Sequence, residues 1–251
     1  MSRLPRADGA FMTFKAIFFD AAGTLFETAV PVAETYALVA KKYGVAVSGR
    51  EIGARFRTCF SSAPPLAFPG ADSGQIRSLE YAWWKELVRR IFEPWGPFVD
   101  FDRYFAELFD HFSKPESWRL FPDTEETLSA LKDHSFILEV ISNFDSRLLG
   151  ILEGLHIASW FDSVILSSHA GFAKPAPQIF EKGLGLFRLK AGEVMHVGDS
   201  PENDIAGARA AGLTGVLVDR DGKGAANSFP RVRNLKEILR LACGNSLSPL
   251  T

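Results

Sequence analysis

The sequence has only two cysteines, Cys59 and Cys243, and they lie far apart in the chain. Their separation matches no cysteine spacing that is typical of a metal site. Two cysteines are also too few for a small fold that depends on several disulfide bonds. We therefore expect free thiols, in the core or on the surface, in a protein of a reducing compartment.

Long apolar runs are missing as well. No stretch approaches the roughly 20 apolar residues that a membrane-spanning helix needs. The segment Met1–Phe11 contains two arginines but lacks the apolar segment of a signal peptide. Met12 is a candidate for the true start, because Met12-Thr13-Phe14 leads directly into the first apolar run. We expect a cytoplasmic protein without a membrane partner.

The sequence also lacks an excess of charge of one sign. With 28 Lys and Arg against 30 Asp and Glu, its net charge is −2. It therefore has no basic surface for nucleic acid or anionic lipid. The 47% hydrophobic and 23% charged residues are ordinary for a globular protein, and no internal repeat is present. A chain of 251 residues can form one large α/β domain or a core with a smaller insert.

Short apolar runs alternate with helical patterns from about residue 115 onward. The residues 136–141, 163–166, 194–197 and 216–218 favour strands, and residues 124–132, 147–155, 178–183 and 205–211 favour helices. Asp123 with Glu126 is typical of a helix N-cap. With the early run 15–19, the pattern predicts five strands in a parallel sheet that is covered by helices on both faces.

The pattern changes between residues 28 and 113, where helical periodicity dominates. Pro31–Tyr43 reads as a helix, and Ser48 with Glu51 forms a capping box that opens a second one. Apolar stripes over residues 79–91 and 101–112 indicate two more, and 63–74 is the longest expected loop. Most of the aromatic residues of this insert, Trp84 among them, are interpreted as the core of a helical bundle.

Polar residues stand where several of the apolar runs end. Asp20 follows the run 15–19 and begins a glycine turn, at the point where open α/β sheets place ligands. Alone, such an aspartate more often caps a turn. Ser142-Asn143 ends a second run, Lys174-Pro175 opens a loop, and the segment 198–204, which holds Asp199 and Asp204, ends a third.

In this order and on these elements, the four segments resemble the motifs of the haloacid dehalogenase (HAD) superfamily. The resemblance implies an α/β fold, a Rossmann-like parallel five-stranded core at residues 12–27 and 114–251. Residues 28–113 would be an inserted all-helical cap of the C1 type. Looser phrases, Pro31-Val32-x-Glu34-x-Tyr36 and Trp83-Trp84-x-x-Leu87-Val88 among them, resemble the subfamily of rhythmically-expressed-gene-2 proteins and haloacid-dehalogenase-like hydrolase domain-containing protein 3.

The resemblance also assigns catalytic roles. It implies that Asp20 is a nucleophile that accepts a phosphoryl group, and that Lys174 supplies a compact positive charge beside it. Ser142 would donate a hydrogen bond to a phosphoryl oxygen. The backbone amides of the Asp20 turn, at Gly23 and Thr24, would assist. Asn143 belongs to the same phosphate-binding group, where we expect it to fix the loop.

A metal site is implied at the same place. Asp20, the backbone carbonyl of Ala22, Asp199 and water would hold Mg²⁺, which prefers hard oxygen ligands. Asp204 is assigned to this site as a residue that orients either a water on the metal or Lys174. His196 lies inside an apolar strand, and we interpret it as a core residue whose hydrogen bonds are satisfied.

One residue departs from the superfamily pattern. Phosphatases of this type usually have a second aspartate two residues after the nucleophile, as a general acid, and here that position is Ala22. The main hypothesis is a Mg²⁺-dependent phosphohydrolase that acts on a small phosphorylated metabolite, slowly or narrowly, as a monomer or homodimer. Hydrolysis of a C–P or C–halogen bond stays open, with Lys41, Lys42 and Lys85 as available cap lysines. So does a protein that binds a phospho-ligand or partner with little turnover.

Overall fold

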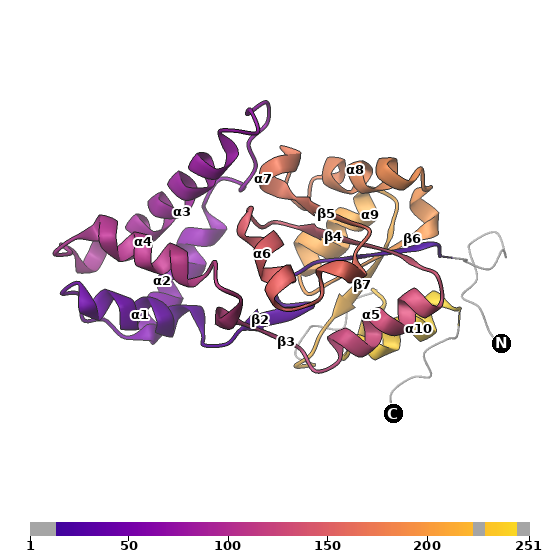
Figure 1. The fold of residues 1–251 in the computed structure, drawn as a ribbon, viewed down its shortest axis with the longest axis horizontal. Helices are drawn as coiled ribbons and strands as arrows, with labels where there is room; N and C mark the ends of the chain where they lie inside the picture. The colour runs from indigo at the N-terminus through magenta and orange to yellow at the C-terminus, as the bar shows by residue number, and fades with distance from the viewer. Residues whose placement is uncertain (1–13, 223–228, 245–251) are drawn as a thin grey trace.

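The computed structural model of the protein describes residues 14–222 and 229–244. The candidate start at Met12 and the segment Met1–Phe11 lie outside these residues. The chain divides visibly into a group of helices at one end and a sheet with its own helices at the other (Figure 1).

A parallel sheet of six strands forms the larger part, in the order β5-β4-β1-β6-β7-β8. The strands are β1 (Ala16–Phe19), β4 (Ile137–Ser142), β5 (Ser163–Leu166), β6 (Val194–Gly198), β7 (Thr214–Val218) and β8 (Arg231–Val232). The first five are the predicted strands. The prediction of only five was wrong, because β8 has two residues, one of them an arginine, and gives no apolar run.

Helices cover both faces of the sheet, and the alternation of side chains along β1 shows the two layers. Ile17 and Phe19 pack in a core with helices α5 (Thr124–Asp133), α6 (Arg147–Gly154) and α10 (Lys236–Ala242). Ala16 and Phe18 pack on the opposite face with α8 (Pro177–Phe187) and α9 (Gly207–Ala210). The short α7 (Ser167–Ala170) follows β5, and a π-helical turn (Pro201–Ala206) precedes α9. Figure 1 shows α8 and α9 on one side of the strands and α5 and α10 on the other.

The inserted segment is helical and has a core of its own. It consists of α1 (Val32–Lys42), α2 (Gly49–Ser61), α3 (Ile76–Phe92) and α4 (Phe101–His111). Its buried residues, such as Ile52, Tyr104 and Leu108, form a cluster separate from the two cores of the sheet. No helix in the described ranges is long and apolar enough to cross a membrane.

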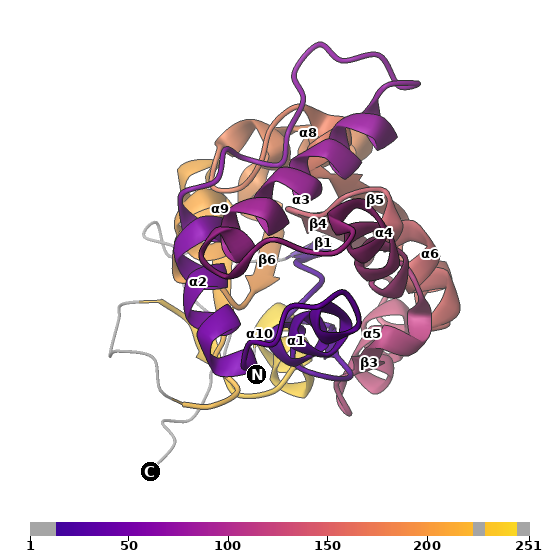
Figure 2. The same ribbon diagram turned by 90° about the vertical axis from the view of Figure 1, so that its left-hand side faces the viewer.

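Two short strands join the helical segment to the sheet. β2 (Phe26–Thr28) pairs with β3 (Trp118–Leu120) in an antiparallel ribbon. β2 lies where the chain enters the helical segment, and β3 lies where it returns to the sheet. The four helices lie together beyond one end of the sheet (Figure 1), and in the turned view they stand in front of it (Figure 2). The ribbon thereby fixes where the helical segment sits relative to β1.

Two predicted helix caps have different outcomes. The capping box of α2 is confirmed, since the Ser48 side chain accepts from the Glu51 amide and the Glu51 carboxylate accepts from the Ser48 amide. Asp123 stands at the N-cap position of α5, as predicted, but its side chain makes no capping bond. Its carboxylate accepts instead from Arg220 and from the amide of Leu235, so it connects α5 to the C-terminal part of the core.

One acidic residue lies inside the sheet without an ionic partner. Glu139, in the middle of β4, is fully buried, and neither carboxylate oxygen has a hydrogen-bond partner of good geometry among the described residues. Burial raises the pKa of Glu139 to about 8, although the nearby Ser163 side chain acts in the opposite direction. In the folded protein Glu139 is therefore protonated at neutral pH.

Because Glu139 is buried, the stability of the protein should depend on pH. Glu139→Gln should remove this dependence, since glutamine does not titrate. Between the ordinary glutamate pKa and about 8, the folded state holds a proton that the unfolded state has lost. The free energy of unfolding then falls by up to about 1.4 kcal/mol per pH unit as pH rises. As pH rises through this window, the free energy of unfolding of Glu139→Gln should increase relative to that of the wild type. Denaturant unfolding from pH 5 to pH 8.5 measures it, with exposed Glu125→Gln as the control. Parallel profiles for Glu139→Gln and wild type would contradict the prediction.

Candidate active site

Three neighbouring strands deliver polar side chains to one edge of the sheet. Asp20 follows β1, Ser142 ends β4 and Asp199 follows β6, and these strands are adjacent and parallel. Lys174 reaches the same place from the loop before α8. All four line one cavity of about 250 Å³, together with Asp204. The sequence-predicted residues of four segments thus meet at the carboxyl edge of the sheet, where such folds bind ligands.

Lys174 is the centre of this arrangement. Its ammonium group lies 2.6 Å from Oδ1 of Asp20 and 2.6 Å from Oδ1 of Asp204, and its side chain is only 2% exposed. The Ser142 hydroxyl donates to the same Asp20 oxygen over 3.3 Å. The Asn143 side chain holds the backbone of Lys174 from both sides, with bonds of 2.7 Å and 2.8 Å. Asn143 therefore fixes the lysine loop.

The charges of this cluster depend on each other. Burial alone would lower the pKa of Lys174, but Asp20 and Asp204 outweigh it and raise the lysine pKa above its usual range. Burial would likewise raise the pKa of Asp204, yet Lys174 and His196 hold it well below the ordinary value. For Asp20, burial exceeds the effect of Lys174, and its pKa is raised. The buried lysine is thus charged and keeps Asp204 ionised.

Asp204 has further partners that hold it in place. Its Oδ1 lies 3.0 Å from Nε2 of His196, and its Oδ2 accepts from the amide of Ser200 over 2.9 Å. His196 is fully buried, and burial lowers its pKa. A side chain at Gly198 would collide with the Asp204 carboxylate, so only glycine fits there. His196 is a core residue as predicted, but its hydrogen bonds are only partly satisfied, because Nδ1 has no partner among the described residues. Its contact with Asp204 was not foreseen.

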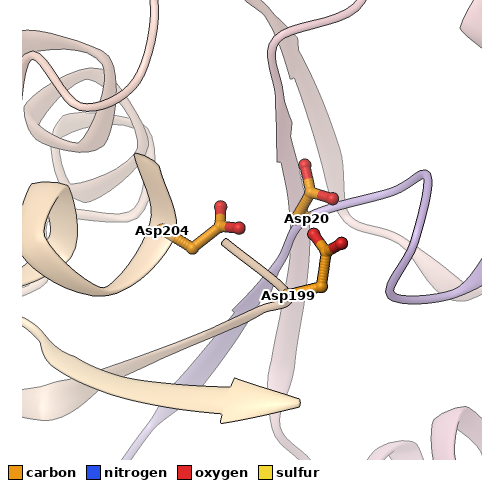
Figure 3. Close-up of side chains that lie close together, drawn as sticks. All are labelled: Asp20, Asp199 and Asp204. Carbon is orange, nitrogen blue, oxygen red and sulfur yellow. The ribbon is translucent and has the colours of Figure 1, made fainter. Parts of the chain in front are cut away.

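The acidic side chains offer ligands that fit a divalent cation. Carboxylate oxygens of Asp20, Asp199 and Asp204 lie within 4.8 Å of one another (Figure 3). The Asp199 side chain faces the open cavity, yet the protein atoms around it and the charges of Asp20 and Asp204 raise its pKa to about 7. A cluster of carboxylates with hard oxygen donors suits Mg²⁺. Ala22, whose carbonyl the resemblance adds to the set, also lines the cavity.

The predicted phosphate-binding role of Gly23 and Thr24 needs correction. The Gly23 amide donates to the Phe26 carbonyl and the Thr24 amide to the Ala21 carbonyl, so the turn itself uses both. Neither residue lines the cavity, and Thr24 is fully buried. Gly23 has a different function in the turn. Its φ of +92° favours glycine, and a side chain there would collide with Asp199.

Aromatic side chains of the helical segment form the opposite wall of the cavity. Phe56 and Phe60 come from α2 and Trp84 comes from α3. The indole N–H of Trp84 donates to Asp145 over 2.6 Å, which fixes the ring at the boundary with the core. Trp84 packs against the core of the helical segment, as the interpretation of the aromatic residues predicted. It also lines the cavity, which that interpretation did not foresee.

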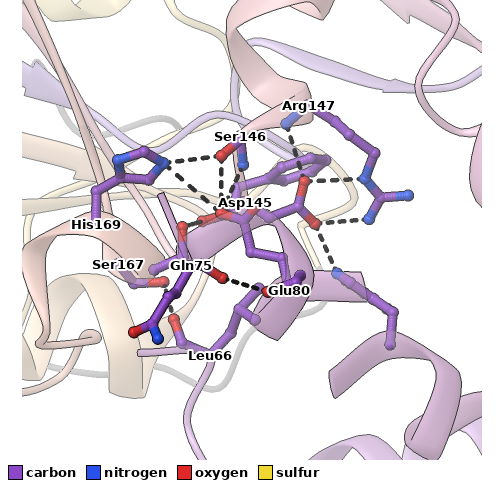
Figure 4. A network of polar contacts seen from close by, with 12 residues as sticks. Leu66, Gln75, Glu80, Asp145, Ser146, Arg147, Ser167 and His169 are labelled. Carbon is purple, nitrogen blue, oxygen red and sulfur yellow. Dashed lines mark hydrogen bonds and ion pairs between the residues drawn. The ribbon is translucent and has the colours of Figure 1, made fainter. Parts of the chain in front are cut away.

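A polar network connects the helical segment to the core beside this wall (Figure 4). Glu80 of α3 is buried and accepts from the backbone and hydroxyl of Ser146, and His169 lies 2.8 Å from the same hydroxyl. The loop 63–74 takes part through Leu66, whose carbonyl accepts from Ser167. Sequence reasoning gave none of these residues a role, because no local pattern indicates a contact across the two parts.

The lysines considered for Schiff-base chemistry are placed elsewhere. Lys42 pairs with Glu107 and Lys85 pairs with Asp102, both within the helical segment, and Lys41 is exposed. None of the three lines the cavity.

The fold and the site together define a class of protein, and the comparisons agree with it. Residues 14–212 match the family model of the haloacid dehalogenase-like hydrolases, and the chain belongs to this family. The protein is accordingly a hydrolase with the α/β fold of the HAD enzymes.

Particular relatives are similar over most of their length. Haloacid dehalogenase-like hydrolase domain-containing protein 3 of Bos taurus is 32% identical over 215 residues, 82% of each chain. Rhythmically expressed gene 2 protein of Drosophila melanogaster is 26% identical over 82% of this chain and 83% of its own. The predicted resemblance to this group is confirmed.

Solved structures share the fold. A HAD phosphatase from Thermococcus onnurineus superimposes with a TM-score of 0.66 at 24% identity, covering 93% of this chain and 100% of its own. The L-2-haloacid dehalogenase from Xanthobacter autotrophicus gives a TM-score of 0.69 at 17% identity, with the same coverage. Phosphatases and dehalogenases both use this fold, so the reaction has to be argued from the site.

The burial of Lys174 between two carboxylates predicts that its removal lowers the stability of the protein. Lys174→Met leaves Asp20 and Asp204 buried without their cation, which should lower the free energy of unfolding by about 3–5 kcal/mol at neutral pH. The loss should shrink at low pH, where the carboxyl groups become protonated. Denaturant unfolding in a chelating buffer measures it, with exposed Lys182→Met as the matched control. Equal stability of Lys174→Met and wild type at neutral pH would contradict the central role of this ion pair.

Proposed function

We propose that this hydrolase is a Mg²⁺-dependent phosphohydrolase that acts on a small phosphorylated metabolite through an aspartyl-phosphate intermediate. The observation that supports it is the bridge from Lys174 to Asp20 and Asp204, with the Asp199 carboxylate on the open side of the same cavity. Phosphoryl transfer depends mainly on positioning and on neutralising negative charge, and these residues can do both.

Each residue has a defined part in this chemistry. The Asp20 carboxylate attacks phosphorus, and the bond to the leaving oxygen breaks, which splits one difficult hydrolysis into two steps. Lys174 compensates the charge on the transferring group, and Ser142 donates a hydrogen bond to it. Asn143 and Asp204 hold Lys174 in position. Water then attacks phosphorus, releases phosphate and restores Asp20.

Mg²⁺ would be held by Asp20, Asp199 and the backbone carbonyl of Ala22. When bound, it supplies positive charge beside the transferring phosphoryl group. Asp204 contributes by orientation, because both of its oxygens already bond to Lys174, His196 and the Ser200 amide.

The alternatives receive less support from the site. A C–P hydrolase that forms a Schiff base needs a lysine at the cavity, and the candidate cap lysines do not line it. A dehalogenase needs no metal, whereas this site keeps Asp199 and Asp204 beside Asp20. Binding of a phospho-ligand without turnover would leave the activity of the wild-type protein equal to that of an Asp20 variant.

Two substitutions separate the nucleophile from the metal ligand. Asp20→Asn should abolish phosphate release at every Mg²⁺ concentration, because an amide does not attack phosphorus. Asp199→Asn should raise the Mg²⁺ concentration needed for half-maximal rate, and excess Mg²⁺ should restore part of the rate. Phosphate release over a Mg²⁺ titration measures both, with exposed Asp72→Asn as the control. No rescue of Asp199→Asn would show that Asp199 acts elsewhere, and turnover that survives chelation would favour the dehalogenase alternative.

The absence of a general acid predicts a steep dependence on the leaving group. Among the described residues that line the cavity, the ionisable ones are Asp20, Lys174, Asp199 and Asp204, and Ala22 occupies the usual acid position. In this proposal Asp20 is the nucleophile and Asp199 binds Mg²⁺, while Lys174 and Asp204 are bonded to each other, so none of the four is free to act as the acid. The rate on phosphate esters should therefore fall as the leaving-group pKa rises. Ala22→Asp should flatten the series and speed alkyl phosphates by up to roughly 10²-fold, the low end for one general acid. A flat series in the wild type would mean that another group is the acid.

A further inference from the structure

A second cavity lies inside the helical segment and adjoins the catalytic one. It has a volume of about 80 Å³, and its walls come from all four helices of the segment, from β3 and from the start of α6. Val32, Phe105 and Leu108 are among its apolar lining residues. Phe56, Trp84 and Phe144 line both cavities, so the two spaces share one wall.

The walls of the second cavity offer almost no polar group. Arg147 is the one ionisable basic side chain among the described lining residues, and its charge is already compensated. Its guanidinium donates to both oxygens of Asp145, at 2.9 Å and 2.6 Å, and lies 3.9 Å from the centre of the Phe109 ring. A ligand group that enters this space therefore meets aromatic and aliphatic surface, which favours an apolar group.

We propose that this cavity binds the apolar end of the leaving group, and that the substrates are acyl phosphates of short aliphatic acids. The proposal rests on the proposed phosphohydrolase function. Ala22 and the shared aromatic wall line the same cavity as Asp20 and Lys174, so the leaving group of a phosphoryl group held there can face them. From there the second cavity is the adjoining apolar space.

The size of the cavity selects the kind of chain. Its volume of about 80 Å³ is close to half of the ~150 Å³ apolar cavity that accepts a benzene ring. A chain of a few carbons fits this space, and an aromatic ring does not. Trp84 lines both cavities and is held in place, because its indole is bonded to Asp145 and its ring packs against Phe60 at 6.3 Å between ring centroids.

The chemistry of an acyl phosphate suits a site without a general acid. Asp20 attacks phosphorus, the P–O bond to the acyl oxygen breaks, and the electron pair leaves with a carboxylate that needs no proton. Water then attacks the aspartyl-phosphate, so that phosphate and one proton are released and Asp20 is restored. The sum is acyl phosphate plus water giving carboxylate, phosphate and a proton. Ala22 is thereby consistent with efficient turnover of this substrate class.

The test is a chain-length series of acetyl, propionyl, butyryl, isovaleryl, octanoyl and benzoyl phosphate. Phosphate release by the Mg²⁺-loaded wild-type protein is measured, and spontaneous hydrolysis is subtracted with Asp20→Asn as the blank. Each methylene that enters the cavity should raise kcat/KM about fourfold, so butyryl should exceed acetyl phosphate roughly 15-fold. Octanoyl and benzoyl phosphate should fall below the optimum.

Two variants connect this preference to the cavity. Val32→Phe fills it and should abolish the advantage of butyryl over acetyl phosphate. The matched control is Val99→Phe, at a position that is 85% exposed in the same segment, and it should keep the wild-type ratio. Phe105→Leu enlarges the cavity and should move the optimum to a longer chain. This variant decides the question if Val32→Phe does not fold, as judged by its circular dichroism spectrum.

The outcomes separate the two proposals. The cavity proposal is overturned if acyl phosphates are hydrolysed without a chain-length optimum. It is also overturned if Phe105→Leu does not move the optimum. In both cases the proposed phosphohydrolase function stands. The cavity proposal is overturned as well if Val32→Phe and Val99→Phe lower the ratio of butyryl to acetyl phosphate hydrolysis equally. If neither these acyl phosphates nor the phosphate esters of the leaving-group series are hydrolysed above the Asp20→Asn blank, the proposed function itself is overturned.

Discussion

The site depends on one buried cation between two carboxylates. Lys174 is almost inaccessible to solvent and lies within hydrogen-bond distance of Asp20 and Asp204 at the same time. A lone buried charge is costly, and removing one partner leaves the others uncompensated. The lysine loop must therefore stay where Asn143 holds it, and the ends of β1 and β6 must stay adjacent. The parallel pairing of these strands provides that constraint.

Sequence reasoning located the elements that have strong local signals. The apolar runs gave five strands of the sheet, since buried parallel strands are nearly continuous in Val, Ile and Leu. Asp20, Ser142 and Asp199 stand at the ends of such runs, and the ends of parallel strands meet at one edge. Their convergence with Lys174 followed from the topology.

What the sequence did not reveal depends on contacts between distant segments. Asp123 precedes a helix and has the form of a cap, yet its carboxylate binds groups about a hundred residues later in the chain. Trp84 packs in the helical segment, but its indole also bonds to Asp145 of the core and lines the cavity that holds Asp20. The amides of Gly23 and Thr24 are used within their own turn, which only the backbone geometry shows. Periodicity gives the buried face of an element and not the partner on that face.

Under the proposed mechanism, Asp20, held beside Lys174, becomes phosphorylated during turnover. Rapid acid quenching of the Mg²⁺-loaded protein with a ³²P-labelled acyl phosphate, followed by peptide mapping, tests it directly. We expect a ³²P label on the peptide that contains Asp20. Hydroxylamine should remove this label, and the Asp20→Asn variant should not acquire it. A label on another residue, or phosphate release by Asp20→Asn at the wild-type rate, would contradict it.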